Sequence, residues 1–244
     1  MSSPLALLAA LAFAAPPGTG DVEALLLRAD AYRLPAGALE VETEVRSYRD
    51  GKLDRERRYR VFLRPGRRSL VLSRSAVERG QKVLMLGDEF WIVLPSSQRP
   101  IRITPAQRLL GDASAGDVAT LTWAGDYGGV VAGEAEVEGR ACLRLDLTAR
   151  REGATYRRNE LYLDRTDARP VRADLFLASE KLAKQARFEL ETVDGRPQVS
   201  AMTLVDRIQG GRETVIRYLS RSGRSIPDAF YNPMFLTRNE PAAE

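Results

Sequence analysis

Histidine is absent from all 244 residues, and cysteine occurs once, at Cys142. The first absence excludes Ser-His-Asp and Cys-His catalytic arrangements and most zinc sites, and it removes the commonest general base. The second excludes an internal disulfide, so the fold cannot depend on covalent bridges. Because Cys142 stands within the segment ACLRLDL, we expect a small buried hydrophobic residue there. The sequence therefore indicates no catalytic residue, no metal site and no cofactor.

Long apolar runs are lacking too, except at residues 5–15, which read LALLAALAFAA. This run is shorter than the roughly 20 residues that a membrane-spanning helix needs. Its length and the triplet Ala12-Phe13-Ala14 are typical of a secretory signal peptide, although no Lys or Arg precedes it. We predict a signal peptide at residues 1–14 and a soluble, periplasmic mature chain; an uncleaved buried helix is the alternative.

The charge balance is mildly basic, with 37 Lys and Arg against 33 Asp and Glu. Such an excess favours anionic surfaces such as phospholipid head groups. The basic residues are spread along the strands and not clustered with aromatics, so nucleic acid is not predicted as a partner. One basic run can meet head groups or simply form a solvated strand face: Arg55, Arg57, Arg58, Arg60, Arg64, Arg67 and Arg68.

Apolar and polar residues alternate with period two along most of the chain, which is typical of half-buried strands. In residues 39–47, for example, Leu39, Val41 and Val45 alternate with glutamates. Dipeptides such as Asp50-Gly51 and Asp194-Gly195 favour hairpins between neighbouring runs. Strands are predicted at residues 39–47, 58–64, 68–75, 81–86, 89–94, 99–103, 130–138, 140–150, 156–164, 170–178, 183–193, 198–207 and 213–222.

Helices are expected at the start and in the middle of the chain. Residues 21–34 predict an amphipathic helix that Asp21 caps and that ends before Pro35. A second helix is expected to start at Thr104, and a third near residues 118–122. The sequence thus predicts a mainly β (α+β) protein: one large, antiparallel, strongly curved sheet whose apolar face the helices cover.

Three segments, in order, resemble the outer-membrane lipoprotein-sorting, LolA-like proteins of bacteria. Residues 87–111, GDEFWIVLPSSQRPIRITPAQRLLG, resemble that family's strand ending in Trp-x-x-x-Pro, followed by basic residues, Ile and a Gln-Arg stretch. Residues 159–176 resemble its apolar strand, Asp turn and Pro-Val-Arg return strand, and residues 226–236 resemble its closing segment. The match is to a divergent, longer branch, and the loop at residues 111–117 lacks the family's usual aromatic residue.

The resemblance implies an unclosed β-barrel around helices that act as plug and lid, formed by a single domain at residues 21–238 with a flexible tail at 239–244. It implies a monomeric carrier of lipid or lipoprotein acyl chains, with an inner-membrane transporter and an outer-membrane acceptor as further partners. The hydrophobic effect also favours such a carrier, because burying each methylene of an acyl chain contributes about 0.8 kcal/mol of binding free energy, or about 12 kcal/mol for a sixteen-carbon chain. Such a carrier needs an apolar cavity and no nucleophile.

The candidate ligand-binding residues are inward-facing strand positions, which alternatively form a filled core. They are Val41, Val45, Tyr59, Val61, Leu63, Met85, Trp91, Leu143, Leu145 and Leu147. The acidic residues Asp112, Asp117 and Asp126 lack the spacing of a calcium loop and are expected in caps and turns. Two other functions stay open: a periplasmic lipid or envelope-stress sensor or transporter accessory subunit, and an enzyme that uses paired carboxylates of residues 109–129.

Overall fold

A computed structural model describes residues 19–34, 37–104, 113, 117, 122–151 and 154–241. The strands are β1 (Leu39–Arg49), β2 (Lys52–Arg64), β3 (Arg68–Ser73), β4 (Lys82–Leu86), β5 (Glu89–Val93), β6 (Ile101–Ile103), β7 (Tyr127–Val137), β8 (Arg140–Ala149), β9 (Arg158–Asp164), β10 (Pro170–Phe176), β11 (Leu182–Val193), β12 (Arg196–Asp206) and β13 (Arg212–Gly223). The helices are α1 (Thr19–Ala31), α3 (Trp123–Asp126) and α4 (Pro233–Leu236), with short 3-10 turns η1 (Ala76–Glu78) and η2 (Asp228–Tyr231).

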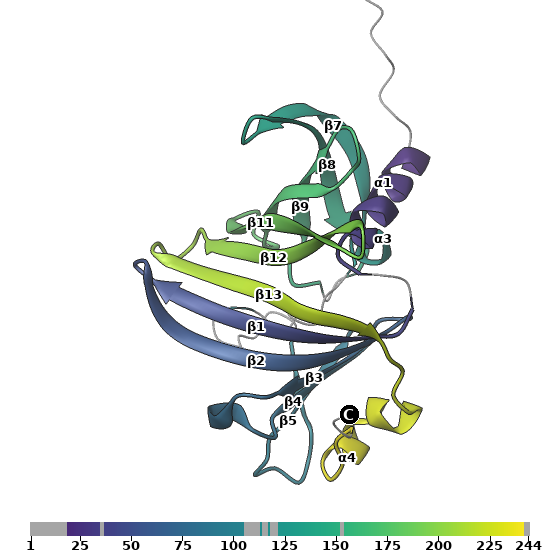
Figure 1. The fold of residues 1–244 in the computed structure, drawn as a ribbon, viewed down its shortest axis with the longest axis vertical. Coiled ribbons are helices and arrows are strands. Elements are labelled where there is room, and N and C mark those ends of the chain that lie inside the picture. Colours follow the sequence, from purple (N-terminus) through teal and green to yellow (C-terminus); the bar gives the residue numbers. More distant parts are fainter. Residues whose placement is uncertain are drawn as a thin grey trace, which may run out of the picture.

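All thirteen strands belong to one antiparallel sheet, which is strongly curved (Figure 1). Strands β1 to β6 follow one another outward from the middle of the sheet. The chain then crosses to the opposite edge at β7 and returns strand by strand to β13, which pairs with β1 from Leu39↔Gly223 to Arg49↔Arg212. Strands β6 and β7 are the two edges, so the barrel is not closed. The predicted fold class and the predicted strands are confirmed.

The two faces of the sheet differ as the alternation predicted. On β1, Leu39, Val41 and Val45 are buried in the main hydrophobic cluster, together with residues of α1; we call this side the inner face. The glutamates between them form ion pairs on the opposite, outer face. Arg60 Nε lies 2.9 Å from Glu40 Oε1 and 2.6 Å from Glu42 Oε1. Part of the predicted basic run is therefore a cross-strand charge ladder.

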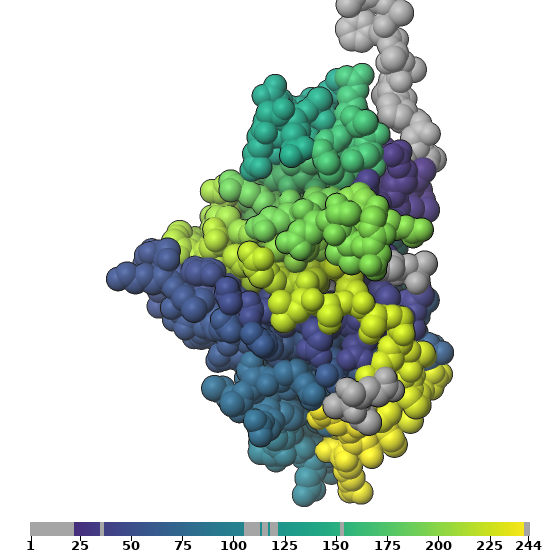
Figure 2. Space-filling view, viewed as in Figure 1, coloured from purple at the N-terminus to yellow at the C-terminus, as the bar shows by residue number. Residues whose placement is uncertain are grey.

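Each face has its own cover. Helix α1 contacts α3 and β7, and its buried residues Val22, Leu26 and Ala29 join the inner-face cluster. The C-terminal segment covers the outer face of the β2–β5 half, where Leu236 and Tyr231 pack on Phe62. Figure 2 shows this segment, in yellow, against the blue strands. The amine of Lys82 donates to the backbone carbonyls of Leu236 and Asn239, both at 2.9 Å.

Helix boundaries differ from the sequence prediction. Helix α1 begins at Thr19, so Asp21 lies inside the first turn and not before it, because the helix includes residues that precede the amphipathic stretch. Of the helix expected to start at Thr104 and the one expected at 118–122, only Thr104 and Thr122 are described, and neither is helical; the predicted signal peptide at 1–14 lies outside the described residues. Cys142 is buried beside Val137 and Tyr162, as predicted, and burial raises the pKa of its thiol. No helix within the described ranges is long and apolar enough to cross a membrane.

Two adjacent glycines on β7 provide a test of how closely β7 and β8 pack. A Cβ on Gly129 would lie 2.0 Å from the backbone oxygen of Asp146, whereas one on Gly128 would meet only the Arg150 side chain, at 3.2 Å. Backbone cannot move aside cheaply, but an arginine side chain can. Gly129→Ala should therefore lower the free energy of unfolding by about 1–3 kcal/mol, as measured by urea denaturation. Gly128→Ala is the matched control and should change it much less; equal losses would contradict this packing.

Candidate functional site

The larger cavity of the inner face lies where the end of α1, α3 and the strands β1 to β4 meet. Its volume is about 560 Å³, and we call it the rim cavity. Apolar side chains from separate elements line it: Leu34, Leu39, Leu63 and Met85. Charged residues line its other side: Asp30, Arg64, Arg67, Arg68, Asp126 and Arg151. The cavity is therefore amphipathic.

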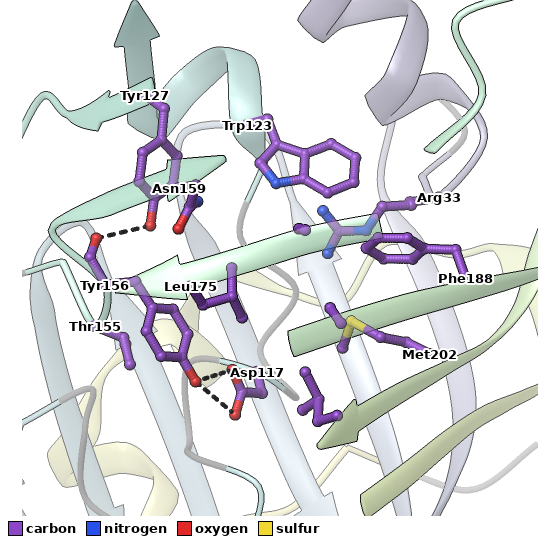
Figure 3. Close-up of a pocket in the computed structure, with 13 residues that line it drawn as sticks. Arg33, Asp117, Trp123, Tyr127, Thr155, Tyr156, Asn159, Leu175, Phe188 and Met202 are labelled. Carbon is purple, nitrogen blue, oxygen red and sulfur yellow. Dashed lines mark hydrogen bonds between the residues drawn. The ribbon is translucent and has the colours of Figure 1, made fainter. Parts of the chain in front are cut away.

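A smaller cavity of about 70 Å³ lies on the β9–β12 half of the same face, and we call it the inner pocket (Figure 3). Most of its wall is apolar, with Trp123 from α3, Leu175 from β10, Phe188 from β11 and Met202 from β12. Phe188 and Met202 are cross-strand partners, and the Trp123 and Phe188 rings meet edge to face with centroids 5.6 Å apart. Polar groups also reach this pocket: Arg33, Asp117, Tyr127, Thr155, Tyr156 and Asn159.

The two cavities are separated by α3 and the end of α1. Trp123 and Tyr127 line the inner pocket, whereas Gly125 and Asp126, from the same short segment, line the rim cavity. On α1 and just beyond it, Arg33 lines the pocket, and its neighbours Asp30 and Leu34 line the rim cavity.

One buried carboxylate ties the two helical segments together. Asp30 Oδ1 accepts the backbone N–H of Trp123 at 3.0 Å, and Oδ2 accepts that of Ala124 at 2.9 Å. Burial raises the pKa of Asp30, against the opposing effects of Arg33 and these two N–H groups. Arg33 Nη1 lies 3.9 Å from Asp30 Oδ1, and its guanidinium stacks 4.3 Å from the centre of the Trp123 ring. Asp30 and Arg33 together fix α3 against α1.

Ion pairs connect α3 to the turns of the sheet beside the rim cavity. Arg67, in the β2–β3 turn, pairs with Asp126 of α3, and its Nη2 lies 3.3 Å from Asp88 Oδ1. Asp88 also pairs with Arg151, at 3.0 Å. Six of the seven arginines predicted to meet head groups divide into two sets: Arg57, Arg58 and Arg60 pair with glutamates, whereas Arg64, Arg67 and Arg68 lie at the cavity and pair with aspartates. The seventh, Arg55, lies away from the cavity and its Nε is 3.5 Å from Asp54 Oδ2.

Hydrogen bonds organise the polar side of the inner pocket. The Tyr127 hydroxyl donates to the backbone oxygen of Tyr156 at 3.0 Å, and burial raises the pKa of Tyr127 to about 12. The Tyr156 hydroxyl donates to Asp117 Oδ1 at 3.0 Å, and Lys184 Nζ lies 2.7 Å from Asp117 Oδ2. Asp117 and Asp126 therefore have cationic partners in separate places, and no acidic cluster that could hold a metal ion occurs among the described residues.

Two of the ten predicted ligand-binding residues, Leu63 and Met85, line the rim cavity. Seven others belong to the inner-face cluster or pack against it and line neither cavity: Val41, Val45, Tyr59, Val61, Leu143, Leu145 and Leu147. Tyr59 has a structural contact, because its hydroxyl donates to Glu78 Oε2 at 3.1 Å.

Trp91 requires a correction, because it does not face inward. It packs with the outer-face cluster under the C-terminal segment. Its neighbours Phe90 and Ile92 take the inner-face positions of β5 instead. A period of two sends adjacent residues to opposite faces, so the apolar run EFWIVL concealed which of them points inward.

Sequence reasoning missed most of the inner pocket. Phe188 and Met202 lie on correctly predicted strands, and their alternation could have indicated them. Trp123 lies in a region that showed no regular period, and Asn159 and Arg33 are polar residues that become neighbours only through tertiary packing. No local sequence pattern indicates such contacts.

Comparison with known proteins agrees with this geometry. A LolA superfamily protein from Nitrosomonas europaea matches with a TM-score of 0.80 and 27% identity, over 86% of this chain and 96% of that one. A DUF1329 family protein from Desulfovibrio piger matches at 0.73 and 22%, over 88% and 97%. A domain described as an outer membrane lipoprotein-sorting protein, from Vibrio parahaemolyticus, matches at 0.74 and 14%, over 91% and 100%. The last two show the fold alone.

The fold and its covered inner face define a LolA-like protein, and the predicted resemblance is confirmed. A family model described as "Uncharacterized protein" matches residues 66–238, and the chain belongs to that family. No curated protein matches the sequence.

The Asp30 tie can be tested by removing its oxygens. Asp30→Ala leaves two buried N–H groups and Arg33 without this acceptor, so the free energy of unfolding should fall by roughly 2–4 kcal/mol. Asp30→Asn keeps one acceptor oxygen and should lose less. The exposed Glu136→Ala, on β7, is the control and should stay within about 0.5 kcal/mol of the parent protein in urea denaturation. If Asp30→Ala had the same free energy of unfolding as the parent protein, the hydrogen bonds of Asp30 would not hold α3 against α1.

Proposed function

We propose that this protein is an exported carrier that takes up the acyl chain of a lipid or lipoprotein and transfers it toward the outer membrane. The observation that carries this proposal is the rim cavity, an amphipathic space of about 560 Å³ lined in part by two helical segments. Its volume falls within the range of about 300–1,000 Å³ that small-molecule sites occupy. The similarity to a LolA superfamily protein supports the same class of function.

The chemistry of the cavity suits a hydrocarbon chain with a polar end. Leu34, Leu39, Leu63 and Met85 offer an apolar wall, and each methylene buried there contributes about 0.8 kcal/mol. Met85 adds an unbranched, polarizable thioether, which adapts to chains of different shape. Uptake by burial needs no nucleophile and no cofactor, and none is proposed.

The charged side of the cavity suits an anionic or polar head group. Its arginines are held by aspartates, as in the pair of Arg67 with Asp126. A phosphate or carboxylate can replace an aspartate as the partner of arginine, because both present oxygens in the geometry that a guanidinium binds. Exchange at Arg67 would at the same time release α3 from the rim. Head-group binding and opening of the cover are thus coupled in this proposal.

The proposed setting is the periplasm, with the apolar run at residues 5–15 acting as the export signal. The proposed carrier works as a monomer, accepts cargo from an inner-membrane transporter and delivers it to an outer-membrane acceptor.

The cavity can be tested by filling it. Leu63 lies in the wall of the rim cavity and Leu53 is 54% exposed on the same strand, so the two leucines of β2 form a matched pair. Leu63→Trp should weaken binding of fluorescently labelled hexadecanoic acid roughly tenfold, because excluding about two methylenes costs about 1.6 kcal/mol. Leu53→Trp should bind as the parent protein does.

Unfolding curves recorded in urea separate loss of the cavity from loss of the fold. The proposal expects Leu63→Trp to remain folded and to bind weakly. A folded wild-type protein that takes up no labelled fatty acid would instead favour the sensor or accessory function.

A further inference from the structure

The inner pocket contains a buried hydrogen-bond acceptor that has no partner among the described residues. Asn159 lies on β9, is only 2% exposed and lines the pocket together with Tyr127 (Figure 3). Its Oδ1 has no hydrogen-bond partner in the part of the chain that the structure describes. A buried oxygen of this kind is rare in native proteins, because leaving it unpaired destabilises the fold. The pocket is therefore built to receive a donor.

The orientation of the Asn159 amide follows from its neighbours. The Tyr127 hydroxyl donates its single proton to the backbone oxygen of Tyr156, 3.0 Å away. Toward Asn159 this hydroxyl can therefore only accept a hydrogen bond. The Asn159 side chain lies within hydrogen-bonding range of that hydroxyl, and a hydroxyl that can only accept is met by the amide nitrogen. The amide nitrogen consequently faces Tyr127, and the oxygen is left for a ligand.

A second polar atom in the same pocket specifies what the ligand must offer. The hydroxyl of Thr155 is buried and likewise lacks a partner among the described residues, and a hydroxyl both donates and accepts. A ligand hydroxyl satisfies Asn159 Oδ1 by donating to it, and Thr155 Oγ1 offers a further polar contact elsewhere in the pocket wall. The nearby Asp117 carboxylate disfavours an anion, and Lys184 and Arg33 disfavour a cation. The matching group is neutral and small, since the pocket measures only about 70 Å³.

The apolar walls specify what carries this group. Leu175, Phe188 and Met202 surround the polar atoms, so the rest of the ligand at this point must be hydrocarbon. We propose that the inner pocket binds a hydroxyl substituent of an acyl chain, with Asn159 as its acceptor and the Thr155 hydroxyl as a further polar contact of the pocket. The chain continues past α3 into the rim cavity. This inference rests on the proposed carrier function and names the class of cargo: hydroxylated acyl chains in preference to unsubstituted ones.

Three probes of equal chain length test the preference: hexadecanoic acid, its β-hydroxylated form and its ω-hydroxylated form. Each displaces a labelled fatty acid from the intact protein. At least one hydroxylated probe should bind the wild-type protein about fivefold more tightly than the unsubstituted acid, the gain expected from a net buried hydrogen bond. Equal affinities for all three would overturn the inference but leave the carrier function standing. Failure of all three to bind would overturn the carrier function as well.

Variants assign the preference to the two named side chains. Asn159→Leu is nearly isosteric and cannot accept a hydrogen bond, so it should reduce the affinity ratio between the hydroxylated and the unsubstituted acid from about fivefold to about one. Thr155→Val removes only the hydroxyl and should reduce the preference, which gives a second test if Asn159→Leu folds poorly. Thr148→Val, at an exposed position of β8, is the control and should keep the full preference. A preference that survives in both pocket variants would contradict the proposal.

Discussion

The pairing of β1 with β13 is the constraint on which the rest of the molecule depends. It joins residues from opposite ends of the sheet's sequence, Leu39 with Gly223 and Arg49 with Arg212, and turns two meanders into one sheet. Alone, each meander would expose an apolar face to water. Joined, they curve around a shared cluster in which Val45 of β1 and Ile216 of β13 are both buried. The rim cavity belongs to the β1–β4 half and the inner pocket to the β9–β12 half, so this one ladder sets their separation.

The cover of the inner face is held by two kinds of contact that differ in what they join. Asp30 binds α3 to α1 through two directed hydrogen bonds from backbone N–H groups in a buried place. Arg67 binds α3 to the sheet by an ion pair with Asp126, and both residues line the rim cavity. The first contact therefore lies within the cover, and the second lies between cover and sheet. Exchange of the second contact alone would let α1 and the α3 segment move as one unit.

Much of this fold could be predicted from the sequence because strand signals are local. Alternation and hairpin dipeptides indicated all thirteen strands, and the apolar-charged alternation on β1 identified its inner face. The candidate site was predicted less well. Leu63 and Met85 line a cavity. Val41 and Leu145 occupy the same kind of inward-facing apolar position in an alternating strand, but they lie in the filled core. What separates them is the distance to the helical cover, which no strand pattern encodes. The prediction that Trp91 faces inward was wrong for a simpler reason, since an unbroken apolar run does not reveal which of its residues face inward.

The polar atoms of the inner pocket suggest how a carrier of apolar chains can still discriminate. Apolar walls accept almost any hydrocarbon, because each buried methylene contributes about 0.8 kcal/mol whichever part of a chain it comes from. A buried acceptor such as Asn159 Oδ1 behaves differently, because only a ligand that brings a donor pairs it, and with any other ligand it stays unpaired at a cost. An aliphatic residue in its place would pack the pocket without this penalty. Retaining an amide there costs stability in the empty protein, and that cost is recovered only when a donor enters. The rim cavity supplies affinity for any chain, and the inner pocket supplies the difference between chains.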